Sequence, residues 1–328
     1  MTGAETLEKS KNHNLGEKLK ELKQGSSIQS ILPIFELIFI LILFNYLTDG
    51  RILLATNIKL LLSQTYMLLI ASMGVFFIMS MGCLDFSQGS MLGVSCIVTC
   101  YLSNYNIILG IVGGMLTGAA IGAMNAFFHI KRKIPSFIVT ICAMYLFRGL
   151  CAYLTTASPV YANSSITEFN TMPFMCGATF VVLMIGFVIF RFTSVGANLK
   201  AIGAGEKAAR FAGIRVERTK FLVYMIAGAI TGFAAFINAI KVGSVTSTGG
   251  NQLETQILIA LVLGGMPISG GAKVKFMNIV IGVLTYKILA SGLVMLGLTT
   301  QMQQLIEGVV FLVVVALFSD RKSILVIK

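Results

Sequence analysis

Long apolar stretches joined by short polar connections dominate the chain. Most approach the roughly 20 apolar residues that an α-helix needs to cross a bilayer. Their approximate limits are 31–47, 60–81, 91–102, 107–128, 137–154, 173–190, 221–240, 253–266, 276–296 and 305–318. The pattern predicts an all-α, polytopic integral membrane protein with about ten transmembrane helices. The stretch 253–266 is too short to cross alone, so it either spans together with its flanks or is re-entrant.

Small and polar residues interrupt the apolar pattern near 82–90 and near 264–271. The same residue types recur there at one constant spacing: Gly82, Ser87 and Gly89 match Gly264, Ser269 and Gly271. Irregular backbone is tolerated inside a membrane only where protein buries it or where it lines a cavity. Duplicated halves with broken helices are typical of transporters. Both segments are therefore expected to be broken or re-entrant.

Composition excludes several classes of protein. Of the 328 residues, 56% are hydrophobic and 12% are charged, against roughly 25% charged in soluble domains. A soluble globule, a disordered chain and a coiled coil are disfavoured. The net charge of +12 does not indicate nucleic acid as a partner, because the basic residues cluster in the connections between apolar stretches.

The basic clusters also predict the orientation of the chain. They lie in the first 25 residues, at 131–133, within 191–220, at 273–275 and after 320. Because Lys and Arg mark cytoplasmic connections, one arrangement with both termini in the cytoplasm places every cluster inside. We expect a cytoplasmic segment (1–27), a single transmembrane domain (28–320) with a cytoplasmic loop at 193–220, and a cytoplasmic tail (321–328).

Residues for catalysis or metal binding are scarce. The sequence lacks a GxxxxGK[ST] phosphate loop and the HExxH, GxSxG and CxxC motifs, so neither ATP binding of the usual kind nor a common hydrolase is indicated. Two histidines and six dispersed cysteines make a metal site improbable. We therefore expect no enzyme activity, no cofactor and no metal.

Four acidic residues lie within or beside apolar stretches: Glu36, Asp85, Glu254 and Glu307. Each costs roughly 2.5–3.5 kcal/mol at a helix centre, so each should face protein, water or an interface. Asp85 either caps the helix that follows it or contacts a solute. Glu254 either caps the eighth segment or faces the external entrance. Glu36 and Glu307 leave open an alternative function, a proton-coupled secondary carrier of a small polar solute.

The segment 206–214 combines charges with small apolar side chains. It predicts a short amphipathic helix that ends near Gly213. One interpretation is a solvated cytoplasmic loop. The other is a knob that docks into a soluble partner, with Ala208, Ala209 and Phe211 as its apolar patch.

Four motifs, in order, carry a family resemblance. They read GCLDFSQGS (82–90), IPSFIVT (134–140), AIGAGEKAARFAGI (201–214) and LGGMPISGG (263–271). In these motifs, and from about residue 57 to about residue 318, which is most of the chain, the sequence resembles the membrane-spanning permease subunits of ribose-type, simple-sugar ABC importers. Cys83, Gln88 and Gly205 depart from the family pattern, so the solute stays open.

The resemblance implies an importer subunit in the bacterial inner membrane that forms the pathway for a small sugar, either a ribose-like pentose, a hexose or a related solute. Its partners would be a cytoplasmic ABC ATPase, an extracytoplasmic sugar-binding protein, a second permease subunit and membrane lipid. It implies two groups of site residues. Coupling to the ATPase falls to Glu206, Ala208, Ala209, Arg210 and Gly213. The translocation pathway or a structural motif falls to Asp85, Ser87, Gly89, Glu254, Gly264, Gly265, Ser269 and Gly271.

Overall fold

The computed structural model describes residues 26–318, and nearly all of the predicted N-terminal segment and the C-terminal tail lie outside this range. The first half of the fold is α2 (Ser26–Leu47), the short 3₁₀ helix η1 (Arg51–Leu53), α3 (Ala55–Ser80), α4 (Gln88–Ser103), α5 (Ile107–Lys131) and α6 (Ser136–Leu154). The middle contains β1 (Val160–Tyr161), α7 (Ser164–Thr167), α8 (Met172–Phe192), α9 (Ser194–Ala204) and α10 (Glu206–Phe211). The last part is α11 (Val216–Val242), β2 (Ser244–Val245), α12 (Leu253–Leu263), α13 (Met277–Met295) and α14 (Thr300–Phe318).

The helical, multi-pass class is confirmed, but fewer helices than expected are long enough to span. Within residues 26–318, α3, α5, α6, α8, α11 and α13 are the six long and apolar enough to cross a membrane. The helix α12 has 11 residues, or roughly 16 Å at 1.5 Å per residue, about half of a bilayer core. The predicted eighth span is therefore not one continuous transmembrane helix.

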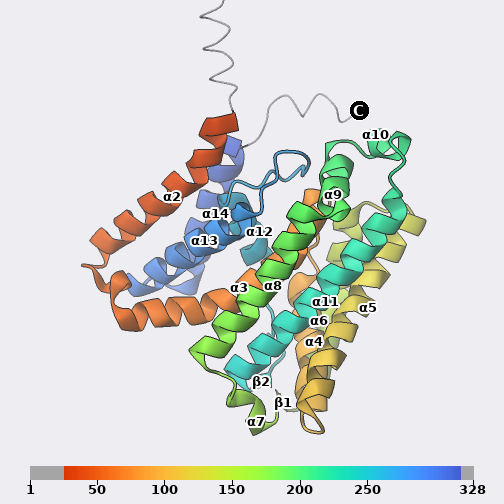
Figure 1. The fold of residues 1–328 in the computed structure, drawn as a ribbon. Coiled ribbons are helices and arrows are strands. Elements are labelled where there is room, and N and C mark those ends of the chain that lie inside the picture. The colour runs from red at the N-terminus through yellow and green to blue at the C-terminus, as the bar shows by residue number, and fades with distance from the viewer. Residues whose placement is uncertain (1–25, 319–328) are drawn as a thin grey trace, which may run out of the picture.

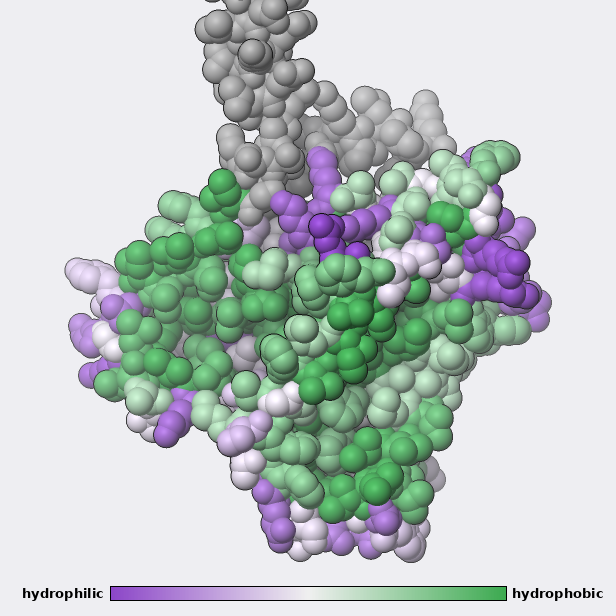
Figure 2. All heavy atoms as spheres, viewed as in Figure 1, coloured by the Kyte–Doolittle hydropathy of each residue, from purple (hydrophilic) through white to green (hydrophobic). Residues whose placement is uncertain are grey.

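The elements group at two ends of the molecule (Figure 1). The start of α2, the end of α14 and the helices α9 and α10 lie at one end, and α7, β1 and β2 lie at the other. Figure 2 shows hydrophilic residues gathered towards both ends, with a broad apolar surface between them. The two strands pair in antiparallel fashion, Val160 with Val245 and Tyr161 with Ser244, and so join the loop after α6 to the loop after α11.

The centre of the fold is α11, which packs against α3, α4 and α5. A Cβ atom on Gly118 of α5 would collide with the carbonyl oxygen of Gly228 on α11, and a Cβ on Gly232 of α11 would collide with the carbonyl oxygen of Gly114 on α5. Small residues allow this close approach because helices in lipid associate through packing. The α5–α11 pair therefore forms a tight unit against which the functional segments are held.

Both predicted interruptions begin with the same helix ending, but in a register one residue away from the sequence match. The N–H groups of Gly82 and Cys83 donate to the carbonyls of Met79 and Ile78, at 2.9 and 3.3 Å. Gly265 and Met266 repeat this pattern with Val262 and Leu261, at 2.8 and 3.1 Å.

Gly82 therefore corresponds to Gly265 rather than to Gly264. The reason is that the residue closing each helix needs a positive φ, which is 74° at Gly82 and 79° at Gly265. Beyond this point the two segments diverge, since α4 starts at Gln88 whereas α13 starts only at Met277.

Candidate functional site

The segment between α3 and α4, residues 81–87, is the place where the four sequence motifs meet; we call it the break. The motif 134–140 contacts it at Leu84. The Leu84 N–H donates to Ser136 Oγ at 3.3 Å, and Thr140 Oγ1 donates to the Leu84 carbonyl at 3.5 Å. The start of α6 therefore fixes the middle of the break.

Asp85 organises the end of the break. Its Oδ1 accepts from the Ser87 N–H at 2.8 Å and from Ser87 Oγ at 2.6 Å. Its Oδ2 accepts from Gln88 Nε2 at 2.7 Å. The carboxylate thus holds the turn just before α4 through Ser87, instead of bonding the first free N–H groups within that helix as the capping expectation had it.

Two further bonds fasten this turn to the central helices. Asn125 Nδ2 of α5 donates to Ser87 Oγ at 2.8 Å, and Thr231 Oγ1 of α11 donates to Gln88 Oε1. Asp85 is only 1% exposed and both of its oxygens are occupied by the protein. This geometry favours a structural role for Asp85, Ser87 and Gln88 over direct contact with a solute.

The second interruption lies directly against the first. The Gly271 N–H donates to the Ser80 carbonyl at 3.1 Å. A Cβ on Gly82 would lie 2.7 Å from the Ser269 carbonyl oxygen. The end of α9 joins the same point, because a Cβ on Gly203 would collide with the Ser80 carbonyl and with the backbone of Gly271. Three backbone segments therefore meet with no room for a side chain.

The other residues predicted to line the pathway lie at two contacts between helices, one at Gly89 and Glu254 and one at Gly264. Gly89 lies against Glu254, whose carboxylate fills the position that a Cβ at Gly89 would take. Glu254 Oε1 forms an ion pair with Arg148 Nη2 of α6 at 2.8 Å, and its Oε2 is buried without a hydrogen-bond partner. Gly264 packs on the backbone of α13 at Asn278. Glu254 therefore pairs with a cation instead of capping α12 with its side chain.

The predicted coupling residues form a short exposed step made by α9 and α10. Glu206 pairs with Arg210 at 3.1 Å and with Lys220 of α11 at 2.7 Å. Partial burial by itself raises the pKa of Glu206, but the hydrogen bonds and charges of Lys220 and Arg210 outweigh it and leave that pKa below its ordinary value. Glu206 is accordingly an anion at neutral pH.

The apolar patch expected on this helix divides in two. Ala209 is 3% exposed and packs inward, whereas Phe211 is 93% exposed and Ala208 is also exposed. An α-helix turns about 100° per residue, so neighbouring positions cannot all share one face. The side chain of Ala209 is therefore not available to a partner. Gly213 has a φ of 84°, as its place after the helix predicts.

Sequence reasoning missed two polar residues beside the break, Lys220 and His129. Lys220 lies in the first turns of α11 and is 7% exposed, although the sequence places it at the edge of the polar segment 191–220. His129 lies in the last turn of α5, and its Nε2 is 3.5 Å from Lys220 Nζ and 3.8 Å from Cys83 Sγ. The sequence carries one signal for both residues: His129 directly follows the apolar stretch 107–128, and Lys220 directly precedes the apolar stretch 221–240.

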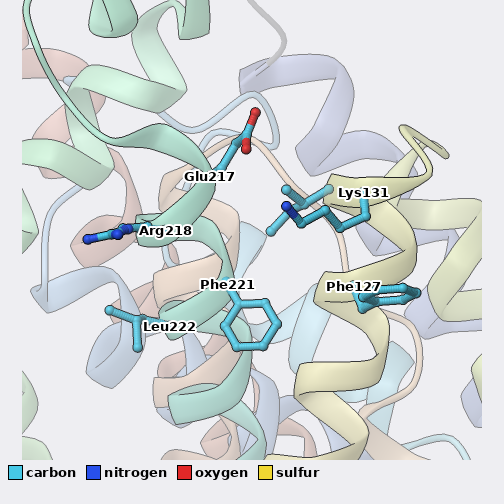
Figure 3. A pocket seen from close by; sticks show the side chains of 7 residues that line it. Phe127, Lys131, Glu217, Arg218, Phe221 and Leu222 are labelled. Atoms are coloured by element: carbon cyan, nitrogen blue, oxygen red, sulfur yellow. The ribbon is translucent and has the colours of Figure 1, made fainter.

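Two surface hollows flank the junction of α10 and α11. The larger, about 410 Å³, lies between the ends of α5 and α11 and is lined by Phe127, Ile130, Lys131, Glu217, Arg218, Phe221 and Leu222. Figure 3 shows Phe221 and Lys131 pointing into the space between the two helices. The smaller, about 270 Å³, is lined by residues 210 and 214–218. Neither is lined by a residue of the break.

Two of the four acidic residues lie elsewhere. Glu307 of α14 accepts from the hydroxyl of Tyr286 on α13, at 3.3 Å to each oxygen. Glu36 lies in α2 and is partly buried. Among residues 26–318, no group of three His, Cys, Asp or Glu side chains could hold a metal ion.

Comparison with known proteins places this arrangement in a family. The model of the family described as "Branched-chain amino acid transport system / permease component" matches residues 57–315, which include all four motifs. The chain belongs to this family of transport permeases.

Three proteins similar to this chain are named for the transport of pentoses. The chain is 30% identical over 323 residues to a ribose import permease of Bacillus subtilis (strain 168), covering 95% of this chain and 99% of the relative. It is 30% identical to an L-arabinose ABC transporter permease of Azospirillum brasilense, covering 74% of each chain. It is 27% identical to a xylose transport permease of Escherichia coli (strain K12), covering 90% and 93%. No solved structure matches the chain significantly.

Proposed function

We propose that the chain is the membrane-spanning subunit of an ABC importer for a small sugar of pentose size. Three relatives named for ribose, arabinose and xylose support the solute class. A cytoplasmic ATPase on a separate chain drives transport, an extracytoplasmic binding protein delivers the sugar, and a second permease subunit completes the pathway. The bacterial inner membrane is the location, with both termini in the cytoplasm.

The observation that carries this proposal is a contact of the break with residues 201–214, which form the end of α9 and all of α10. We call these residues the coupling stretch. Gly203 of α9 touches both Ser80 and Gly271, so the exposed step of α9 and α10 is in direct backbone contact with both interruptions. A protein that pushes on α10 therefore displaces the junction at which α3, α4 and the segment after α12 change direction. The exposed Phe211 supplies an apolar anchor of the kind that protein interfaces favour.

The polar residues of the break then serve the architecture of the pathway. Irregular backbone inside a membrane must have its polar groups satisfied by protein. Asp85 does this for the Ser87 N–H, while the side chains of Ser87 and Gln88 hold its carboxylate in place. We infer that they keep the start of α4 intact while neighbouring segments move.

Reconstitution tests the proposal. The chain is placed in proteoliposomes with a candidate ABC ATPase and a candidate sugar-binding protein of the same organism, and uptake of radiolabelled ribose, arabinose and xylose is measured with and without ATP. We expect ATP-dependent uptake of at least one pentose, and no ATP hydrolysis by the chain alone. Uptake by the chain alone under a proton gradient would instead support the secondary carrier, with Glu36 or Glu307 as its proton site.

A further inference from the structure

A series of side chains in contact with one another connects the coupling stretch to the break. Lys220 Nζ lies 2.7 Å from Glu206 Oε2 and 3.5 Å from His129 Nε2. His129 Nε2 in turn lies 3.8 Å from Cys83 Sγ. This series of side chains starts on α10, passes through α11 and α5, and ends in the break.

The hydrogen-bond chemistry fixes the direction of these contacts. His129 Nδ1 lies 2.8 Å from the Ile134 carbonyl oxygen, which can only accept, so Nδ1 carries the proton and donates. In the neutral ring Nε2 is then an acceptor. Its single lone pair faces two donors, the ammonium group of Lys220 and the thiol of Cys83, and accepts from one of them at a time. Each neighbouring pair in the series can therefore form a donor–acceptor contact.

Burial makes this chain more than a surface contact. Lys220 is 7% and Cys83 is 5% exposed. A buried ammonium group is tolerated only when it is paired and hydrogen-bonded, and Glu206 and His129 are the partners that the structure provides. The ion pair of Arg210 with Glu217, at 3.6 Å between side chains that are both more than half exposed, has no such constraint.

The helices that bear the link are themselves held firmly. Lys220 and His129 belong to α11 and α5, whose backbones approach closely at Gly118 and Gly228. By contrast, α10 has six residues and lies between Gly205 and Gly213. A displacement of α10 therefore acts on the α5–α11 unit through Glu206, and on the break through His129.

We propose that Lys220 and His129 are positioning residues of the transport cycle, linking Glu206 on the coupling stretch to Cys83 in the break. This link rests on the proposed function, because it carries the motion that an ATPase imposes on α10. It acts beside the backbone contact at Gly203, so the coupling stretch holds the break at two points.

The native thiol of Cys83 reports on the link. The exposed cysteines Cys142 and Cys176 are replaced by alanine, and the chain is purified in complex with its ATPase. The rate of alkylation by N-ethylmaleimide is measured at Cys83 by peptide mass spectrometry, without nucleotide and after trapping with ATP and vanadate. We expect trapping to change this rate about fivefold or more, at the lower end of the usual coupling between sites.

The variants then separate a link from a merely structural role. In Lys220→Met and His129→Phe the response of Cys83 to trapping is lost, while the amount of bound ATPase is unchanged. Lys220→Arg restores the response because it keeps the charge and the donors. Glu217→Gln, which removes the exposed partner of Arg210, responds like the unaltered chain. If Lys220→Met does not yield a monodisperse protein, Glu206→Gln breaks the same link from a partly exposed position.

The outcomes that oppose the proposal are distinct. A Cys83 response in Glu206→Gln and His129→Phe equal to that of the unaltered chain overturns the link but leaves the importer function intact. Absence of any response in the unaltered complex also overturns the link. Failure of the chain to bind an ATPase overturns the proposed function, and this is seen before any thiol is measured.

Discussion

The amide nitrogen of Gly271 donates a hydrogen bond to the carbonyl oxygen of Ser80, 3.1 Å away. This bond joins the last turn of α3 to the segment after α12, so the two interruptions that share a helix ending also share a contact. Gly203 of α9 packs into the same corner. The coupling stretch is therefore attached to the membrane part of the protein where its helices are interrupted.

Gly203→Ala should destabilise the protein by about 1–3 kcal/mol, the usual cost of overpacking. Its Cβ would collide with Ser80 and Gly271 backbone atoms that cannot rotate away. The measurement is the temperature at which the monodisperse peak is lost in size-exclusion chromatography after heating in detergent.

Gly205→Ala is the matched control for Gly203→Ala. A Cβ at Gly205 meets nothing closer than Ala208 Cβ at 3.8 Å, and its φ of 172° is extended backbone that any residue adopts. It should leave the melting temperature unchanged. Equal melting temperatures for the two variants would contradict the close backbone contact at Gly203.

The apolar pattern of the sequence predicted where helices lie, because lipid demands apolar side chains over the full length of a span. It could not predict their lengths at the interruptions. Residues 253–266 are as apolar as a span, yet α12 ends at Leu263, since Gly265 adopts a positive φ and closes the helix. The periodicity of apolar residues does not show where such a helix ends. The glycine match between the two interruptions paired Gly82 with Gly264, one residue away from its structural equivalent Gly265.

For the candidate site, too, the sequence predicts part of the structure and not the rest. The order of the motifs indicated that residues 82–90, 201–214 and 263–271 serve the function, but only the fold shows that these segments are in contact. The inward orientation of Ala209 and the pairing of Glu254 with Arg148 depend on which helices become neighbours. Side-chain contacts between residues 106 positions apart, such as this pair, leave no mark on a single sequence.

Arg148→Gln should destabilise the protein by about 1–3 kcal/mol, because it leaves the Glu254 carboxylate buried without its cation. The double variant Arg148→Gln/Glu254→Gln should recover most of that loss, since no charge is then left unpaired. Heating in detergent followed by size-exclusion chromatography measures both. A double variant less stable than Arg148→Gln would show that the pair does not account for the burial of Glu254.

Asp85→Asn should lower stability together with the uptake of every pentose that the unaltered chain transports. An amide presents one N–H₂ group where the carboxylate accepted from Ser87 or Gln88, so at least one donor faces another donor. The comparison is melting temperature against ATP-dependent uptake of ribose, arabinose and xylose. A variant of normal stability with an altered preference among the sugars would instead mean that Asp85 contacts the solute.

Topology can be tested with single cysteines in a background without native cysteines. Cysteines at Ser164, exposed at the start of α7, and at Ser247, exposed in the loop after β2, should react with an impermeant thiol reagent applied to intact cells. A cysteine at Ser194, exposed at the start of α9, should react only after the membrane is opened. Ser164 is preferred to Asn163, whose side chain caps α7. Labelling of Ser194 from outside would invert the assigned orientation.

Phe211→Asp should abolish co-purification of the ATPase while leaving the melting temperature of the isolated permease unchanged. The side chain is 93% exposed, so its replacement removes no internal packing, and an apolar anchor at the centre of an interface carries a large share of binding energy. The assay is recovery of untagged ATPase on the tagged permease, normalised to permease in the membrane.

Ala209→Glu is the contrasting variant. Ala209 is buried, so a glutamate there forces α10 away from its support and should lower the melting temperature as well as ATPase binding. Gly213→Val should reduce binding through strain, because a β-branched residue resists the φ of 84°. Full ATPase recovery with both Phe211→Asp and Gly213→Val would remove the coupling role from α10, leaving a solvated helix at the surface.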